Sequence, residues 1–105
     1  MRVDIFRLNM LGRWRYLTQA RALDYNRYGL GVVAAVKLAP GTDVQLDLHA
    51  PGMILRRVSA QVVSCERCGQ GYRLGLRTYD TLQDLLAGEN MQLRFLAGME
   101  TALAP

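Results

Sequence analysis

Short alternating segments separated by closely spaced turn signals are the feature that most constrains the fold of this 105-residue chain. Apolar and polar residues alternate along 44–48, and the same period of two recurs in 58–62 and 72–77. Alternation of this kind is typical of strands that bury one face. The turns at 39–42 and 50–52 are too short to hold a crossover helix. The pattern therefore predicts neighbouring antiparallel strands in an all-β protein.

The alternating segments predict about five strands, after which the sequence changes its period. The strands are expected at 15–23, 28–36, 44–48, 53–65 and 72–77. At 81–86 a capping box overlaps leucines that share one helical face, which predicts a helix, whereas 91–96 fits either a further helical turn or a short strand. Closing such a sheet removes its exposed edges, so we expect a small barrel or curled sheet covered by the C-terminal helix.

The length of the chain is that of a single domain, 1–105, because a second hydrophobic core would need more residues. No repeat, low-complexity stretch or linker divides it. Within this domain we expect an arginine-rich N-terminal segment at 1–15, the barrel at about 15–79 and a helical segment at about 80–98.

The composition argues against several classes of protein. The longest apolar run, Leu30–Val36, is far shorter than the roughly 20 residues of a transmembrane helix, and the charged N-terminus is unlike a signal peptide, so we expect a cytoplasmic protein without a membrane span. A single histidine, His49, and the lack of phosphate-loop and nucleophile-elbow motifs argue against an enzyme. Cys65 and Cys68 are too few for a disulfide scaffold or a four-ligand zinc site, so neither a metal nor a cofactor is expected.

The positive charge of the chain is concentrated near its N-terminus. The formal net charge is +4, and all the basic residues except Lys37 are arginines. Residues 1–27 hold six arginines against Asp4 and Asp24, which accounts for the whole excess. Because the arginine fork binds phosphate at two points and stacks on flat rings, the pattern predicts an anionic partner for this quarter of the chain. A solvated arginine-rich face is the alternative.

The hexapeptide Asp24–Gly29, Asp-Tyr-Asn-Arg-Tyr-Gly, resembles the Asp-x-Ser-x-x-Gly motif of PilZ domains, with Asn26 in place of the serine. The turn at 38–41 and the segments 59–63 and 72–77 follow in the order and spacing of that family. The resemblance implies a small antiparallel PilZ-type β-barrel of about six strands with a C-terminal helix. It also implies a bacterial, cytoplasmic, non-enzymatic signalling module that binds the second messenger cyclic di-GMP.

The resemblance also implies which residues bind the nucleotide. Asp24 would read a guanine edge, because a carboxylate accepts hydrogen bonds from the two neighbouring donors there. Asn26 and Gly29 would complete the pocket, the glycine by letting a flat ligand approach the backbone. The phosphates would be neutralised by arginines, for which the candidates are Arg2, Arg13, Arg15 and Arg27.

The sequence departs from the family in one place. PilZ receptors carry an Arg-x-x-x-Arg motif before the first strand, but ahead of Asp24 no two arginines stand four apart, and Arg13-Trp14-Arg15 is the nearest cluster. Four later arginines are interpreted as charges on strand faces, namely Arg56, Arg57, Arg73 and Arg77. The alternative that one of them lines the same surface as the motif stays open.

The sequence therefore leaves three functions open. The first is a cyclic di-GMP receptor whose N-terminal arginine segment orders on binding and whose state is read by a protein partner of a motility or secretion system. The second is a PilZ-like protein-interaction module that binds no nucleotide and acts through its apolar surface and C-terminal helix. The third is a barrel that binds nucleic acid through its basic quarter, and such binding would fall steeply with salt. A metal or redox role for Cys65 and Cys68 is less favoured than any of these.

Overall fold

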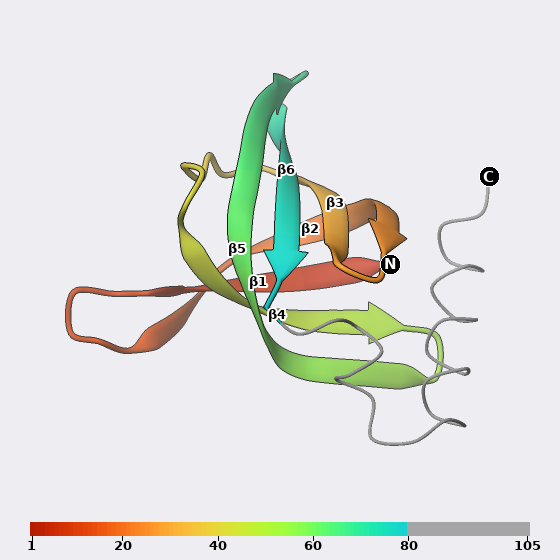
Figure 1. The fold of residues 1–105 in the computed structure, drawn as a ribbon, viewed down its shortest axis with the longest axis horizontal. Coiled ribbons are helices and arrows are strands. Elements are labelled where there is room, and N and C mark those ends of the chain that lie inside the picture. Colours follow the sequence, from red (N-terminus) through yellow and green to blue (C-terminus); the bar gives the residue numbers. More distant parts are fainter. Residues whose placement is uncertain (80–105) are drawn as a thin grey trace.

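The computed structural model describes residues 1–79, which form a closed six-stranded antiparallel barrel (Figure 1). The strands are β1 (Arg2–Leu8), β2 (Trp14–Asn26), β3 (Gly29–Ala34), β4 (Asp43–Ala50), β5 (Met53–Cys68) and β6 (Gly71–Thr78). Around the barrel they follow the order β1-β2-β3-β6-β5-β4, and the pairing of β1 with β4 closes the ring. The prediction of an all-β antiparallel barrel of about six strands is therefore confirmed.

The predicted C-terminal helical segment at 80–98 lies outside the described residues. Within residues 1–79, the structure has no helix that is long and apolar enough to cross a membrane.

Strand β1 is the element that the sequence analysis missed. The prediction starts the barrel at about residue 15, whereas the structure starts it at Arg2. Val3 and Ile5 point into the barrel and are fully buried, while Asp4 alternates with them on the outer wall. The alternation is short: it covers Arg2–Ile5 and ends at Phe6, an apolar residue at an outer position, which Arg7 follows. Because Arg2–Leu8 already pairs with both β2 and β4, the predicted switch by ordering of residues 1–15 is not supported for this strand.

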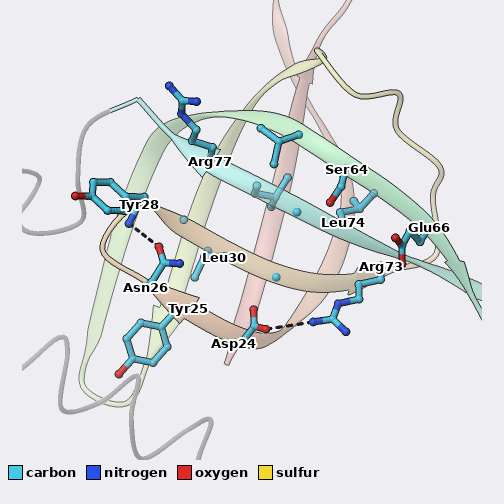
Figure 2. A pocket seen from close by; sticks show the side chains of 15 residues that line it. Asp24, Tyr25, Asn26, Tyr28, Leu30, Ser64, Glu66, Arg73, Leu74 and Arg77 are labelled. Carbon is cyan, nitrogen blue, oxygen red and sulfur yellow. Dashed lines mark hydrogen bonds and ion pairs between the residues drawn. The ribbon is translucent and has the colours of Figure 1, made fainter.

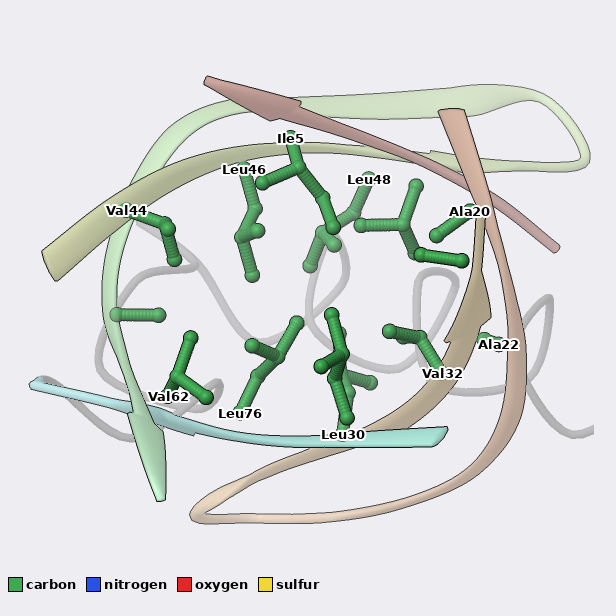
Figure 3. Packing of buried hydrophobic residues seen from close by; sticks show 14 of the residues in the cluster. Ile5, Ala20, Ala22, Leu30, Val32, Val44, Leu46, Leu48, Val62 and Leu76 are labelled. Carbon is green, nitrogen blue, oxygen red and sulfur yellow. The ribbon is translucent and has the colours of Figure 1, made fainter. Parts of the chain in front are cut away.

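Side chains from all six strands fill the barrel interior (Figure 3). The largest fully buried ones include Ile5, Leu46, Leu48 and Leu74, and Leu38 joins them from the segment between β3 and β4. Burying one such side chain stabilises the fold by about 1.5–3 kcal/mol, so the interior is the main source of stability. Because these side chains occupy the interior, a ligand site formed by the described residues has to lie on the outer wall.

Candidate functional site

Two β-bulges turn polar side chains outward on the same side of the barrel. In β2 the register with β3 shifts between Ala22 and Asp24, so that Leu23 is an extra residue. Asp24 would otherwise share the buried face of Ala22, but the bulge leaves its carboxylate exposed. In β5 the register with β6 shifts in the same way between Val62 and Ser64, and Ser64 is exposed. The two bulges thus place Asp24 and Ser64 on the outer wall.

A pair of glycines lies between these two side chains. Gly31 of β3 pairs with Gly75 of β6, Asp24 pairs with Gly31, and Ser64 pairs with Gly75, so the four residues form one row across four strands. A Cβ at Gly31 would overlap the Asp24 carboxylate, and a Cβ at Gly75 would overlap the Ser64 hydroxyl. The missing side chains therefore let Asp24 and Ser64 lie close against the sheet. We call Gly31 and Gly75 the glycine pair.

A shallow, open pocket of about 610 Å³ lies over the glycine pair, and Figure 2 shows the side chains that line it. Both signs of charge and two phenol rings occur around it. These side chains come from β2, the β2–β3 turn, β5 and β6, and they are Asp24, Tyr25, Tyr28, Glu66, Arg73 and Arg77.

Asp24 and Arg73 form an ion pair across this pocket. Nη2 of Arg73 donates to Oδ2 of Asp24 at 3.2 Å, from a position two residues along β6 from Gly75. The Arg73 side chain is 52% exposed and the Asp24 side chain 63% exposed. A pair this open to solvent contributes only about 0–1 kcal/mol to stability, so a ligand can replace either partner at little cost.

Hydrogen bonds fix the turn between β2 and β3 at one end of the pocket. Asn26 Oδ1 accepts the backbone N–H of Tyr28 at 2.8 Å. The Tyr28 carbonyl accepts the backbone N–H of Thr78 at 2.8 Å and its hydroxyl at 3.1 Å, which ties the turn to the end of β6. Gly29 is also required here, because a Cβ would overlap the Leu76 carbonyl oxygen. The Asn26 oxygen therefore shapes the turn, and its side-chain nitrogen is the group left to donate to a ligand.

The arrangement suits a flat ligand that carries both donors and negative charge. A planar ring that approaches over the glycine pair meets the Asp24 carboxylate and the Ser64 hydroxyl, which fill the space that side chains at Gly31 and Gly75 would take. The Asp24 carboxylate offers acceptors at one side. Arg73 and Arg77 stand four residues apart on β6, which separates their Cα atoms by about 13 Å. Two anionic groups, or one anionic group and a base edge, can be contacted along that strand.

The structure brings some of the predicted site residues together and leaves others elsewhere. Asp24, Asn26 and Gly29 line the pocket, and Arg27 lies between them in the turn without lining it. The other three candidates are not among the lining residues of the described part of the chain. Arg2 lies on β1, where it contacts Asp4 and His49, and two more arginines lie on the β1–β2 hairpin, namely Arg13 and Arg15.

Arg73 and Arg77 both line the pocket, whereas the sequence analysis placed them among the strand-face charges and allowed for only one such arginine beside the motif. They do have the Arg-x-x-x-Arg spacing, although they follow the hexapeptide along the chain instead of preceding it. The signal that would have found them is the register: Gly31 pairs with Gly75, so β6 lies beside the motif and its outward arginines flank the same floor.

A second cluster of polar side chains lies where β1 meets β4 and has the residue types of a metal site. Asp4, Asp47 and His49 bring one ligand atom each within 4.8 Å of one another, where β1 meets β4. The cluster is already neutralised from several sides. Oδ2 of Asp4 contacts Nε2 of His49 at 3.0 Å, and Arg2 contacts the same ring. Asp47 accepts the backbone N–H of Arg57 at 2.9 Å, and its Oδ2 lies 3.8 Å from Nη1 of Arg56. We interpret the cluster as an ion-pair network that holds the two strands together.

Comparison with known proteins gives one match. The family model described as PilZ domain matches residues 9–98, which is most of the chain and includes the whole pocket. Strand β1 lies ahead of the matched region. A search of curated proteins and a search of solved structures each returned no match.

Proposed function

Because this chain belongs to the PilZ domain family, whose members are signalling modules of the cyclic di-GMP receptor type, we propose that its pocket binds cyclic di-GMP. We further propose that a protein partner, of a motility or secretion system, reads the bound state. The observation that carries the proposal is the position of Asp24: a bulge holds its carboxylate outward, beside an arginine and against the glycine pair.

Asp24 is suited to read a guanine. The Watson–Crick edge of guanine presents an N1–H and an exocyclic amine side by side, and a carboxylate accepts from both. The side chain is 63% exposed, so it can reach a ligand without any movement of the backbone. A guanine that takes over the carboxylate also releases Arg73 from its ion pair.

The released Arg73 and its neighbour Arg77 take the anionic part of the ligand. Both guanidinium groups are exposed on β6 and carry the two-point geometry that matches phosphate or the O6 and N7 atoms of a second guanine. The phenol rings of Tyr25 and Tyr28 flank the pocket as surfaces on which a base can stack. Binding thus replaces the weak ion pair between Asp24 and Arg73 by a contact of each side chain with the ligand.

Calorimetric titration of cyclic di-GMP into the full chain, with GMP as the control ligand, tests this site. We expect saturable binding and an affinity at least tenfold lower for Asp24→Ala, since each hydrogen bond to a charged group is worth about 1.5–3 kcal/mol. The affinity of Asp24→Asn, which keeps one acceptor oxygen, is expected to lie between those of the wild type and Asp24→Ala. Unchanged affinity in Asp24→Ala, with thermal unfolding also unchanged, would contradict the assignment of the site.

The alternative is a PilZ-type interaction module that binds no nucleotide, and one observation favours it. None of the four arginines predicted to bind phosphate lines the pocket among the residues described. If the wild-type chain binds no cyclic di-GMP while it unfolds cooperatively, the alternative is the correct one. The proposal below does not depend on which of the two holds.

A further inference from the structure

The hairpin between β1 and β2 extends beyond the barrel wall (Figure 1). Its large apolar side chains are unusually exposed: 102% for Met10, 80% for Leu11, 57% for Tyr16 and 47% for Leu8. Trp14 is half-buried on the same hairpin. We call Leu8–Tyr16 the apolar finger.

Hydrogen bonds hold the tip of the apolar finger in one conformation. Oδ1 of Asn9 accepts the backbone N–H groups of Leu11 and Arg13, at 2.9 and 3.0 Å. The Asn9 N–H donates to the Arg13 carbonyl at 2.8 Å, and Gly12 supplies the positive φ of +75° that the reversal needs. The exposure of Met10 and Leu11 is therefore part of a built loop, and a partner would not have to meet the entropic cost of ordering it.

The finger has an apolar face and a basic face. Leu8 pairs with Trp14 across the hairpin, so their side chains share one face. Arg7 pairs directly with Arg15 on the other face, and both are exposed. Two like charges opposite each other destabilise a hairpin, so this pair favours an anionic partner.

The charge on the finger itself has a single sign. Between Asp4 and Asp24 the chain contains no acidic residue, and Arg13 adds a third guanidinium beside Arg7 and Arg15. The carboxylate beside the base of the finger is Asp43 of β4, which precedes the partner of Arg7 and already accepts a hydrogen bond from Tyr79. Apolar side chains form the protruding tip, and arginines and aromatic rings lie behind it. This order matches a bilayer interface, where the acyl chains lie deepest and the phosphates and headgroups lie above them.

We propose that the apolar finger docks this protein on an anionic lipid surface. Met10 and Leu11 enter the boundary between headgroups and acyl chains, and Trp14 lies at the level of the headgroups. Arg7, Arg13 and Arg15 extend to the lipid phosphates. The attachment is peripheral and reversible, and it lies on a part of the barrel that does not line the ligand pocket.

Flotation with vesicles tests the proposal, using phosphatidylcholine alone and phosphatidylcholine with about one-third phosphatidylglycerol. We expect the full chain to float with the anionic vesicles and not with the neutral ones, and to be released by salt. Trp14 is the only tryptophan, so its emission should shift to the blue on binding and report insertion directly. Absence of flotation with anionic vesicles at low salt would overturn the proposal.

Matched variants separate the parts of the finger. Met10→Ser combined with Leu11→Ser should reduce partitioning at least tenfold, because the inserted apolar surface is lost. Each of Arg13→Ala and Arg15→Ala should weaken it about fivefold. The controls outside the finger, Ile54→Ser and Arg67→Ala, remove an exposed apolar residue and an exposed arginine and should leave partitioning unchanged.

Two results of the variant series would count against insertion. If the double serine variant floats as wild type does, the contact is charge adsorption alone. If Ile54→Ser or Arg67→Ala reduces flotation as much as the finger variants do, the finger is not the attachment site. A finger that captures an acidic protein groove instead of lipid would give no blue shift with either kind of vesicle, which also overturns the proposal.

Discussion

Asp24 lies at the pocket because of Leu23, the extra residue ahead of it in β2. Strict alternation after Ala22 would point the carboxylate into the barrel, where an unpaired charge is costly to bury. The bulge moves Asp24 to the outer wall and within 3.2 Å of Arg73. A single position in the register thus decides whether this carboxylate is a defect of the core or a group that can bind a ligand.

At the residue scale, Arg73→Ala is expected to lower the affinity for cyclic di-GMP at least tenfold while changing the free energy of unfolding by less than about 1 kcal/mol. The small effect on stability follows from the exposure of the ion pair with Asp24. Arg67→Ala, which removes an exposed arginine of β5 that does not line the pocket, is the control, and calorimetry measures both variants. Higher affinity in Arg73→Ala would show that breaking the ion pair costs more than Arg73 returns in contacts with the ligand, contrary to the exchange proposed.

Tyr79 gives a pH-dependent prediction. Its hydroxyl donates a hydrogen bond to Asp43, and this bond, together with the negative charge of Asp43, raises the pKa of Tyr79 above its ordinary value, with Arg77 opposing in part. The folded state therefore retains the Tyr79 proton more strongly than the unfolded chain does. The resulting stabilisation is fully present below the ordinary tyrosine pKa of about 10 and is lost as the pH rises through the higher folded-state value.

The measurement for Tyr79 is an ultraviolet titration of the phenolate bands. The titration should contain a step above the ordinary tyrosine pKa of about 10, and Tyr79→Phe should remove that late step. Asp43→Ala should move the step back toward the ordinary value. A late step that survives in Tyr79→Phe would assign the raised pKa to another tyrosine.

At the scale of elements, the sequence predicted the strands in which apolar and polar residues alternate regularly. It did not predict β1 or the bulges, which depend on how the strands pair. The segments 44–48, 53–65 and 72–77 correspond to β4, β5 and β6, because their inward apolar residues repeat with a period of two. In β1 that period covers only Arg2–Ile5 and ends at Phe6. A bulge adds one residue without changing composition, so neither of the bulges at the pocket is visible before the register is known.

The same limit explains how much of the site could be predicted. Asp24, Asn26 and Gly29 are neighbours in sequence, so one motif identified them together. Arg73 lies 49 residues from Asp24 and reaches it only because β3 and β6 pair, which no local pattern reveals. Arg13 precedes Asp24 closely in sequence, yet it lies on the hairpin that projects beyond the barrel.

The glycines give a prediction about neighbouring positions of β3. Gly29→Ala should destabilise the protein by about 1–3 kcal/mol, because its Cβ would overlap the Leu76 carbonyl, which is main chain and cannot rotate away. Gly31→Ala should cost less than about 1 kcal/mol, because the overlapping group is the exposed Asp24 carboxylate. It should nevertheless weaken binding of cyclic di-GMP, since that carboxylate has to move.

Urea unfolding and calorimetry on both glycine variants distinguish these effects. The expected pattern is a stability loss in Gly29→Ala and an affinity loss without a comparable stability loss in Gly31→Ala. Equal destabilisation by the two substitutions would mean that the Asp24 side chain is held as firmly as the backbone.

At the scale of the whole molecule, closure of the barrel depends on β1. Ile5 is fully buried between β2 and β4, so Ile5→Ala should lower the free energy of unfolding by about 2–5 kcal/mol. Leu8→Ala, at the exposed end of the same strand, should change it by no more than about 0.5 kcal/mol. Urea denaturation followed by circular dichroism measures both. Similar stability of the two variants would indicate that β1 does not contribute to the core as the barrel requires.

The pairing of β1 with β4 also has a consequence for the nascent chain. On the ribosome, β1 can pair with β2 early, but its other edge has no partner until β4 is synthesised, and the ring closes only after β6 reaches β3. At about 5–20 residues per second, that edge stays open for several seconds. Charged residues guard open strand edges against pairing with other chains, and β1 carries Arg2, Asp4 and Arg7. The charged residues of this strand thus protect it from aggregation before the barrel exists.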